Sequence, residues 1–93
     1  MKRSAQEDPN EFEQGLKVGS HSLVLLNDNV NSYDYVIESL VEVCNHNAIQ
    51  AEQCTLIAHH NGKCEVRTGG FDMLKTMKDE LARRGLSSLI YSC

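Results

Sequence analysis

One short segment constrains the fold more than any other: an apolar stretch that runs directly into three small polar residues. Residues 23–26 (Leu-Val-Leu-Leu) have the character of a buried strand, and residues 27–29 (Asn-Asp-Asn) follow without a break. Asn and Asp side chains bond their own backbone and favour turns, and Asn31 or Ser32 can cap a helix just afterwards. The sequence therefore predicts a strand, a polar turn and a helix, with an amide and a carboxylate where the helix packs on the strand.

The length and the charge of the chain exclude several classes of protein. The 93 residues suffice for one domain with a modest core. Nine basic and thirteen acidic side chains give a net charge of -4 without a basic block, which argues against nucleic acid as a partner. No stretch approaches the roughly 20 apolar residues that a membrane span needs, and no apolar run follows the charged N-terminus. We therefore expect a cytoplasmic protein that binds neither nucleic acid nor membrane.

Hydrophobic periodicity divides the chain into an extension and a core. Residues 1–20 hold the only proline and a few scattered apolar residues, so we expect a flexible N-terminal extension. Residues 21–93 are expected to form the core domain. Their hydrophobic pattern predicts strands over 22–26, 63–68 and 88–92, and helices over 33–46, 49–60 and 71–84. Gly69 and Gly70 are expected to break the chain before the last helix, whose apolar stripe is Phe71, Leu74, Met77 and Leu81. The order β-α-α-β-α-β predicts an α+β, two-layer sandwich with three helices on a three-stranded sheet.

The cysteines raise the question of a metal site. Three histidines lie between three cysteines that recur every ten residues: Cys44, His46, Cys54, His59, His60 and Cys64. No Cys-x-x-Cys pair is present, and on a helix Cys54 and His59 point about 140 degrees apart, which argues against one shared metal ion. We therefore expect reduced, buried thiols and neither metal nor cofactor.

One helix face supplies the second half of a candidate binding site. Thr55, Ala58 and His59 have i, i+3 and i+4 spacing, so they lie on one face and form a shallow concavity. If this face lies beside the first strand, His59 comes close to Asn27 and Asp28, and the three offer hydrogen-bond acceptors at the rim. The floor would consist of Leu25, Leu26, Val36 and Ala58. Because an ammonium group carries three donors and no acceptor, the arrangement fits a free protein N-terminus with a large apolar first side chain.

Five short motifs follow one another along the predicted core. They are Leu-Asn-Asp-Asn (26–29), Tyr-Val-Ile (35–37), Ala-Glu-Gln (51–53), His-His-Asn-Gly-Lys (59–63) and Leu-Ala-Arg-Arg-Gly-Leu (81–86). In this order and at this spacing they resemble the ClpS family, the adaptor proteins of the ATP-dependent Clp protease. The resemblance extends over about residues 22–91 and implies the ClpS fold, which is similar to that of the C-terminal domain of the ribosomal stalk protein.

The resemblance to ClpS implies a function and a set of site residues. It implies a non-enzymatic adaptor that binds the N-terminal hydrophobic or aromatic residue of a substrate, an N-degron, and delivers the substrate to a Clp AAA+ unfoldase of the ClpA or ClpC type. The substrate α-amino group would be held by Asn27, Asp28 and His59. The hydrophobic pocket would be lined by Leu25, Leu26, Asn31, Tyr33, Val36, Thr55, Ala58 and Leu89. The extension over residues 1–20 would engage the unfoldase, and no cofactor is implied.

Departures from the family pattern leave two alternatives open. The family usually carries Met and Val where this chain has Thr55 and Ala58, so one alternative is a general protein-interaction domain with an inactive pocket. The other is a small hydrolase that pairs Cys54 or Cys44 with His59. Cysteine catalysis requires the nucleophile within hydrogen-bond reach of its base, and the predicted helix makes Cys54 a poor partner for His59.

Overall fold

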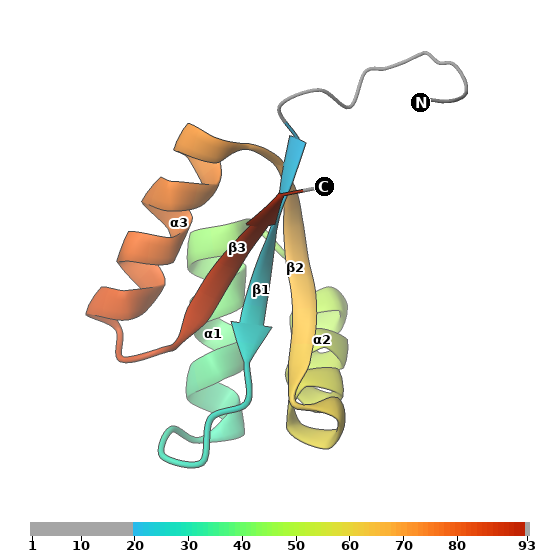
Figure 1. The fold of residues 1–93 in the computed structure, drawn as a ribbon. Helices are drawn as coiled ribbons and strands as arrows, with labels where there is room; N and C mark the ends of the chain where they lie inside the picture. The colour runs from blue at the N-terminus through green and yellow to red at the C-terminus, as the bar shows by residue number, and fades with distance from the viewer. Residues whose placement is uncertain (1–19, 93) are drawn as a thin grey trace.

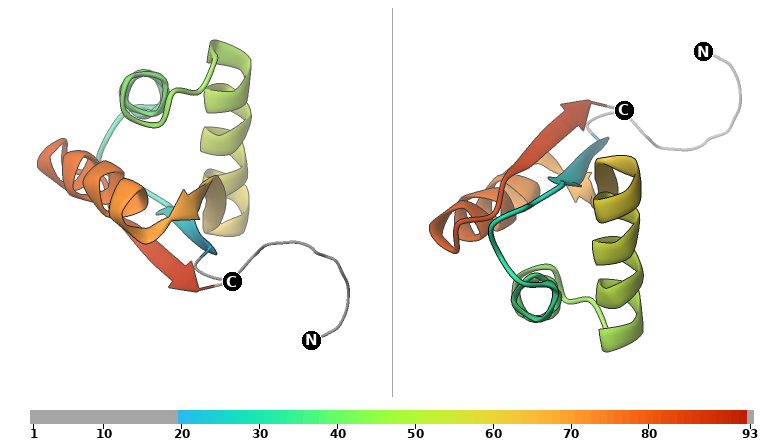
Figure 2. Two further views of the ribbon diagram at one scale, coloured as in Figure 1. Left: turned by 90° about the horizontal axis from the view of Figure 1, so that it is seen from above. Right: turned by 90° about the horizontal axis from the view of Figure 1, so that it is seen from below.

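A three-stranded antiparallel sheet forms one layer of the structure (Figure 1). The central strand β1 (Ser20–Leu26) lies between β2 (Lys63–Gly70) and β3 (Ser88–Ser92). The helices α1 (Tyr33–Cys44), α2 (Ala48–Asn61) and α3 (Phe71–Arg83) form the second layer, and the two end-on views show them on one side of the sheet (Figure 2). This computed structural model describes residues 20–92, so the predicted extension lies, apart from Ser20, outside the described residues. The predicted α+β sandwich is confirmed.

The register of the sheet determines which side chains face the helices. Leu23 and Leu25 of β1 are at most 2% exposed and belong to the core between the layers. Ser88 of β3 pairs with Leu25, and Leu89 pairs with Val24. Because paired residues of antiparallel strands point to the same face and neighbours alternate, Ser88 faces the helices and Leu89 faces away from them.

Caps define the helices that frame the site. The Ser32 hydroxyl accepts a hydrogen bond from the Tyr35 backbone N–H at 3.2 Å and starts α1. Asn47 and Gln50 form a capping box at the start of α2, and Gly62, with a φ of 91°, closes it as predicted. The first helix ends two residues earlier than predicted, because Asn45 adopts a left-handed conformation. Among the described residues, no helix has both the length and the apolar character to cross a membrane.

Two predictions about the junction between β2 and α3 are wrong. Gly69 and Gly70 do not break the chain but extend β2, where they pair with His21 and Ser20. The φ of Gly69 is 155°, which L side chains rarely adopt, and a Cβ atom there would lie 2.5 Å from the flexible end of the Met73 side chain. Glycine is therefore favoured here within a strand rather than in a turn. Phe71 does not join the buried stripe of α3: it is 45% exposed and packs edge-on against the His21 ring.

Candidate functional site

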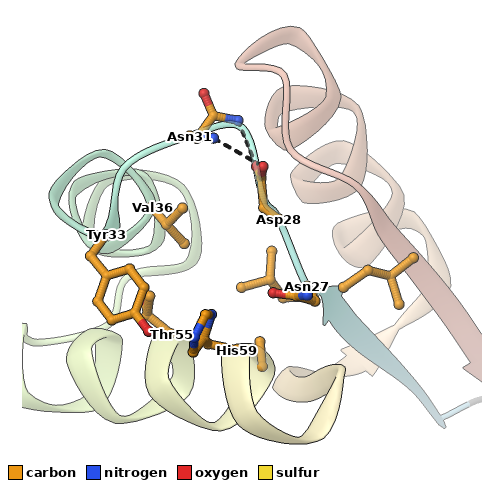
Figure 3. A pocket seen from close by; sticks show the side chains of 10 residues that line it. Asn27, Asp28, Asn31, Tyr33, Val36, Thr55 and His59 are labelled. Atoms are coloured by element: carbon orange, nitrogen blue, oxygen red, sulfur yellow. Dashed lines mark hydrogen bonds between the residues drawn. The ribbon is translucent and has the colours of Figure 1, made fainter.

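A small cavity lies where the end of β1, the loop that follows it and one face of α2 meet (Figure 3). It is lined by Leu25, Leu26, Asn27, Asp28, Asn31, Tyr33, Val36, Thr55, Ala58 and His59. The structure therefore brings together every residue predicted for the site except Leu89, whereas their binding roles stay predictions. The cavity volume is about 20 Å³, far below the roughly 300 Å³ or more of typical small-molecule sites. A large side chain can enter only if the walls move.

The Asp28 carboxylate organises the loop between β1 and α1. Its Oδ1 atom accepts hydrogen bonds from the backbone N–H groups of Val30 at 2.7 Å and Asn31 at 3.0 Å, and its Oδ2 atom accepts from Asn31 Nδ2 at 2.5 Å. Asn31 Nδ2 also donates to the Gly85 carbonyl oxygen at 3.2 Å, which ties the loop to the chain just after α3. Burial raises the pKa of Asp28, but the hydrogen bonds from Asn31 and Val30 outweigh it and hold the pKa below its ordinary value. Asp28 is thus an ionised and largely engaged acceptor.

Replacing Asp28 with alanine is expected to lower the free energy of unfolding by about 1 to 3 kcal/mol, because three donors lose their acceptor. Since the folded-state pKa of Asp28 lies below its ordinary value, this stabilisation is present above about pH 4 and is lost as the pH falls through the folded pKa. Urea unfolding of wild type and Asp28→Ala from pH 7 to pH 3 would measure it. The control is Glu38→Ala, an exposed carboxylate on α1. A difference that stays constant down to pH 3 would contradict the proposed role of the carboxylate.

One backbone hydrogen bond joins two walls of the cavity. The Asn27 N–H donates to the Gly62 carbonyl oxygen at 2.9 Å, so the end of β1 is fastened to the end of α2. Asn27 is exposed, and its Nδ2 atom donates to Asn29 Oδ1 at 3.4 Å. No group within residues 20–92 donates a hydrogen bond to Asn27 Oδ1, which therefore remains available as an acceptor at the rim.

Two aromatic rings from different helices meet at the mouth of the cavity. The His59 ring of α2 lies edge-on to the Tyr33 ring of α1, with centroids 5.2 Å apart (Figure 3). His59 also contacts the ring of His60 at the same centroid distance. Both rings of the first pair are exposed, and Tyr33 retains 41% of its accessible surface. The Tyr33 side chain can therefore move without disturbing the buried core.

The floor of the cavity is apolar, although it includes a threonine. Val36, Thr55 and Ala58 are each at most 5% exposed. The Thr55 hydroxyl donates to the Ala51 carbonyl oxygen one turn earlier on α2, at 2.8 Å. Because its hydroxyl is engaged within its own helix, Thr55 contributes chiefly its methyl group to the cavity. The small Ala58 side chain leaves the space beside it open.

The structure does not place Leu89 at the predicted site. It is 41% exposed, pairs with Val24 and lies on the face of the sheet that points away from the helices. Its neighbour Ser88 is the residue that faces the helices beside Leu25. Hydrophobicity predicts the opposite orientation of this strand, and a shift of one residue in a strand exchanges its two faces.

The two cysteines predicted as candidate nucleophiles, Cys44 and Cys54, do not show the features of an activated thiol. Burial raises the pKa of the Cys44 thiol to about 11, and burial together with the neighbouring Cys64 thiol raises the pKa of Cys54. The Cys54 thiol donates to the Glu65 carbonyl oxygen at 3.5 Å, and no hydrogen bond joins it to His59. An activated cysteine requires the reverse, namely a lowered pKa and a base within reach. Within residues 20–92, no group of three or more His, Cys, Asp or Glu side chains could hold a metal ion.

A comparison with known protein families identifies the chain. The family described as "ATP-dependent Clp protease adaptor protein ClpS" matches residues 17–88. The chain belongs to the ClpS family. The match covers all six helices and strands at least in part, including every residue that lines the cavity.

Individual ClpS proteins agree with this assignment. Two proteins named ATP-dependent Clp protease adapter protein ClpS, from Campylobacter jejuni subsp. jejuni and subsp. doylei, are each 37% identical to this chain over 60 residues. The alignment covers 62% of this chain and 62% of those proteins, so the chain spans less than two thirds of their length. The structure of Agrobacterium tumefaciens ClpS2 bound to L-phenylalaninamide has a TM-score of 0.74 at 20% sequence identity, over 77% of this chain and 94% of that one. The predicted ClpS fold is confirmed.

Proposed function

We propose that this ClpS-family protein is an adaptor of an ATP-dependent Clp protease. It binds the free N-terminal hydrophobic or aromatic residue of a substrate and delivers that substrate to a Clp AAA+ unfoldase of the ClpA or ClpC type. The observation that carries the proposal is the cavity, where acceptors at the rim stand over an apolar floor. An α-amino group supplies three donors and a positive charge, and the side chain attached to it supplies the apolar surface.

The proposal gives the three rim residues different tasks. Asn27 Oδ1 and a neutral His59 ring nitrogen accept hydrogen bonds from the substrate ammonium group. The Asp28 carboxylate already accepts three hydrogen bonds, so it acts mainly through its negative charge, which is felt over several ångströms. The first side chain of the substrate then enters the cavity above Val36 and Ala58 after Tyr33 moves aside.

The small cavity volume supports a second candidate function. At about 20 Å³, the cavity is also what an interaction domain with an inactive pocket would show. The third possibility, a hydrolase that uses Cys54 or Cys44, has no support in the raised pKa values of these buried thiols. We therefore propose a binding protein without catalytic activity.

One titration distinguishes the three functions. Peptides that differ only in their first residue, Phe, Leu or Gly, would be titrated with the protein while fluorescence anisotropy reports binding and mass spectrometry reports cleavage. An adaptor binds the Phe and Leu peptides and leaves them intact, with the Gly peptide weaker by about 10-fold or more, because burying a large apolar side chain contributes about 1.5 to 3 kcal/mol. Equal binding of all three peptides, or none, would favour the inactive pocket, and cleavage would favour the hydrolase.

Deleting residues 1–19 is expected to leave peptide affinity unchanged within about twofold, because every residue that lines the cavity lies between Leu25 and His59. Delivery to the unfoldase, which the resemblance to ClpS assigns to the extension, should fail. The measurement pairs anisotropy with the rate at which a Clp protease degrades a Phe-first reporter protein. Loss of peptide binding in the truncated protein would show that the extension belongs to the binding site.

A further inference from the structure

Ser88 carries a buried hydroxyl that the fold leaves without a partner. The residue is 7% exposed, and its Oγ atom forms no hydrogen bond among the described residues. Buried polar groups in folded proteins are nearly always paired, so an unpaired one calls for an explanation. Ser88 is also the only buried serine of β3, since Ser92 at the other end of the strand is exposed.

Ser88 does not itself line the cavity, but it lies directly behind a residue that does. Ser88 pairs directly with Leu25, which lines the cavity, and Cβ atoms of directly opposed residues lie roughly 4.5 to 5.5 Å apart. The Leu26 N–H donates to the Ser87 carbonyl oxygen at 3.0 Å, which holds the start of β3 against the end of β1. Ser88 therefore keeps its place when Tyr33, on the far wall, moves to admit a side chain.

The floor of the cavity in front of Ser88 offers no competing polar group. Leu25, Val36 and Ala58 are apolar, and the Thr55 hydroxyl is engaged by the Ala51 carbonyl oxygen. A side chain that is apolar along its length and polar at its tip would satisfy both the floor and the Ser88 hydroxyl. Tyrosine has this form, whereas phenylalanine would leave the Ser88 hydroxyl unpaired.

We propose that Ser88 is a specificity-determining residue, which pairs with the phenolic hydroxyl of an N-terminal tyrosine and so favours Tyr over Phe as the first residue of the substrate. The inference rests on the proposed function, because it names the preferred member of the substrate class. One neutral hydrogen bond with a buried partner changes affinity by about 3- to 10-fold. The Tyr-first peptide should exceed the Phe-first peptide by this factor.

The test compares three peptides that begin with Tyr, Phe or para-methylphenylalanine, the last matching Tyr in size without its hydroxyl. Wild type should prefer Tyr to both others, and Ser88→Ala should bring the three affinities within about twofold of one another. Ser87→Ala is the matched control, because Ser87 is the adjacent serine and is exposed; it should keep the wild-type preference. Ser88→Ala should fold normally, since it removes an unpaired group, and its Tm should equal or exceed that of wild type.

Two results would overturn the proposal. A Tyr to Phe affinity ratio that is the same in wild type and Ser88→Ala would show that the hydroxyl does not contact the substrate. A clear fall in Tm for Ser88→Ala would show that the hydroxyl already has a partner in the folded protein. If the Tyr-first and Phe-first peptides both bind to wild type, either result contradicts the role of Ser88 but leaves the proposed function intact. If neither peptide binds to wild type, both the proposed function and the role of Ser88 are wrong.

Discussion

N-acetylation of a Phe-first peptide is expected to abolish its binding. Acetylation removes the positive charge and two of the three donors of the α-amino group, so the acceptors at the rim of the cavity lose the group that they recognise. The apolar side chain is unchanged by the modification. The two peptides would be titrated side by side by fluorescence anisotropy at pH 7. Equal affinity for the acetylated and the free peptide would exclude recognition of an α-amino group.

The same prediction has a counterpart in the protein. Asn27→Ala should weaken binding of the free peptide about 10- to 150-fold, which corresponds to about 1.5 to 3 kcal/mol for a lost hydrogen bond to a charged group. Asn61→Ala is the matched control, because Asn61 is exposed at the end of α2 and does not line the cavity. Similar losses in both variants would indicate a general effect on the fold.

Ala58→Leu is expected to block the pocket. Ala58 lines the cavity, so the added carbon atoms would occupy part of the space that a substrate side chain needs. Loss of the apolar burial that a large side chain provides, about 1.5 to 3 kcal/mol, would weaken a Phe-first peptide by about 10- to 150-fold. The affinity of the Phe-first peptide, measured by anisotropy, is the readout.

The control for this variant adds the same atoms elsewhere on the same helix. Ala48 is the first residue of α2 and is exposed, so Ala48→Leu should bind like wild type. Because overpacking a buried position can cost about 1 to 3 kcal/mol, the Tm of both variants would be measured as well. A folded Ala58→Leu protein with wild-type affinity would show that the substrate side chain enters elsewhere.

The parts of the fold that the sequence predicts well are those with local causes. Ser32 begins α1 through a hydrogen bond of its side chain, and Gly62 ends α2 through its left-handed backbone conformation. Both can be recognised without knowledge of the rest of the chain. The face shared by Thr55, Ala58 and His59 follows from helical spacing alone, and the structure places all three in the lining of the cavity. Asn27 and Asp28 could also be predicted to lie at the site, because they come directly after the first strand.

Features that depend on distant contacts could not be predicted from the same patterns. Leu89 is more apolar than Ser88, yet the register with β1 turns Ser88 inward, and no local signal reveals that register. Gly69 resembles a chain break, but glycine is favoured there by a φ of 155° within β2. The hydrogen bond from Asn31 Nδ2 to the Gly85 carbonyl oxygen joins residues 54 positions apart, so no local pattern predicts it.

The hydrogen bond from the Asn27 N–H to the Gly62 carbonyl oxygen bears on how the pocket opens. Because it joins the ends of β1 and α2, we expect these two walls to stay together when a guest side chain enters, and the Tyr33 side chain to move instead. The Asn27 amide proton thereby becomes a built-in spectroscopic reporter. Its exchange with solvent stays slow while a single side chain rotates and becomes fast when the backbone walls separate, so one resonance distinguishes the two modes of opening.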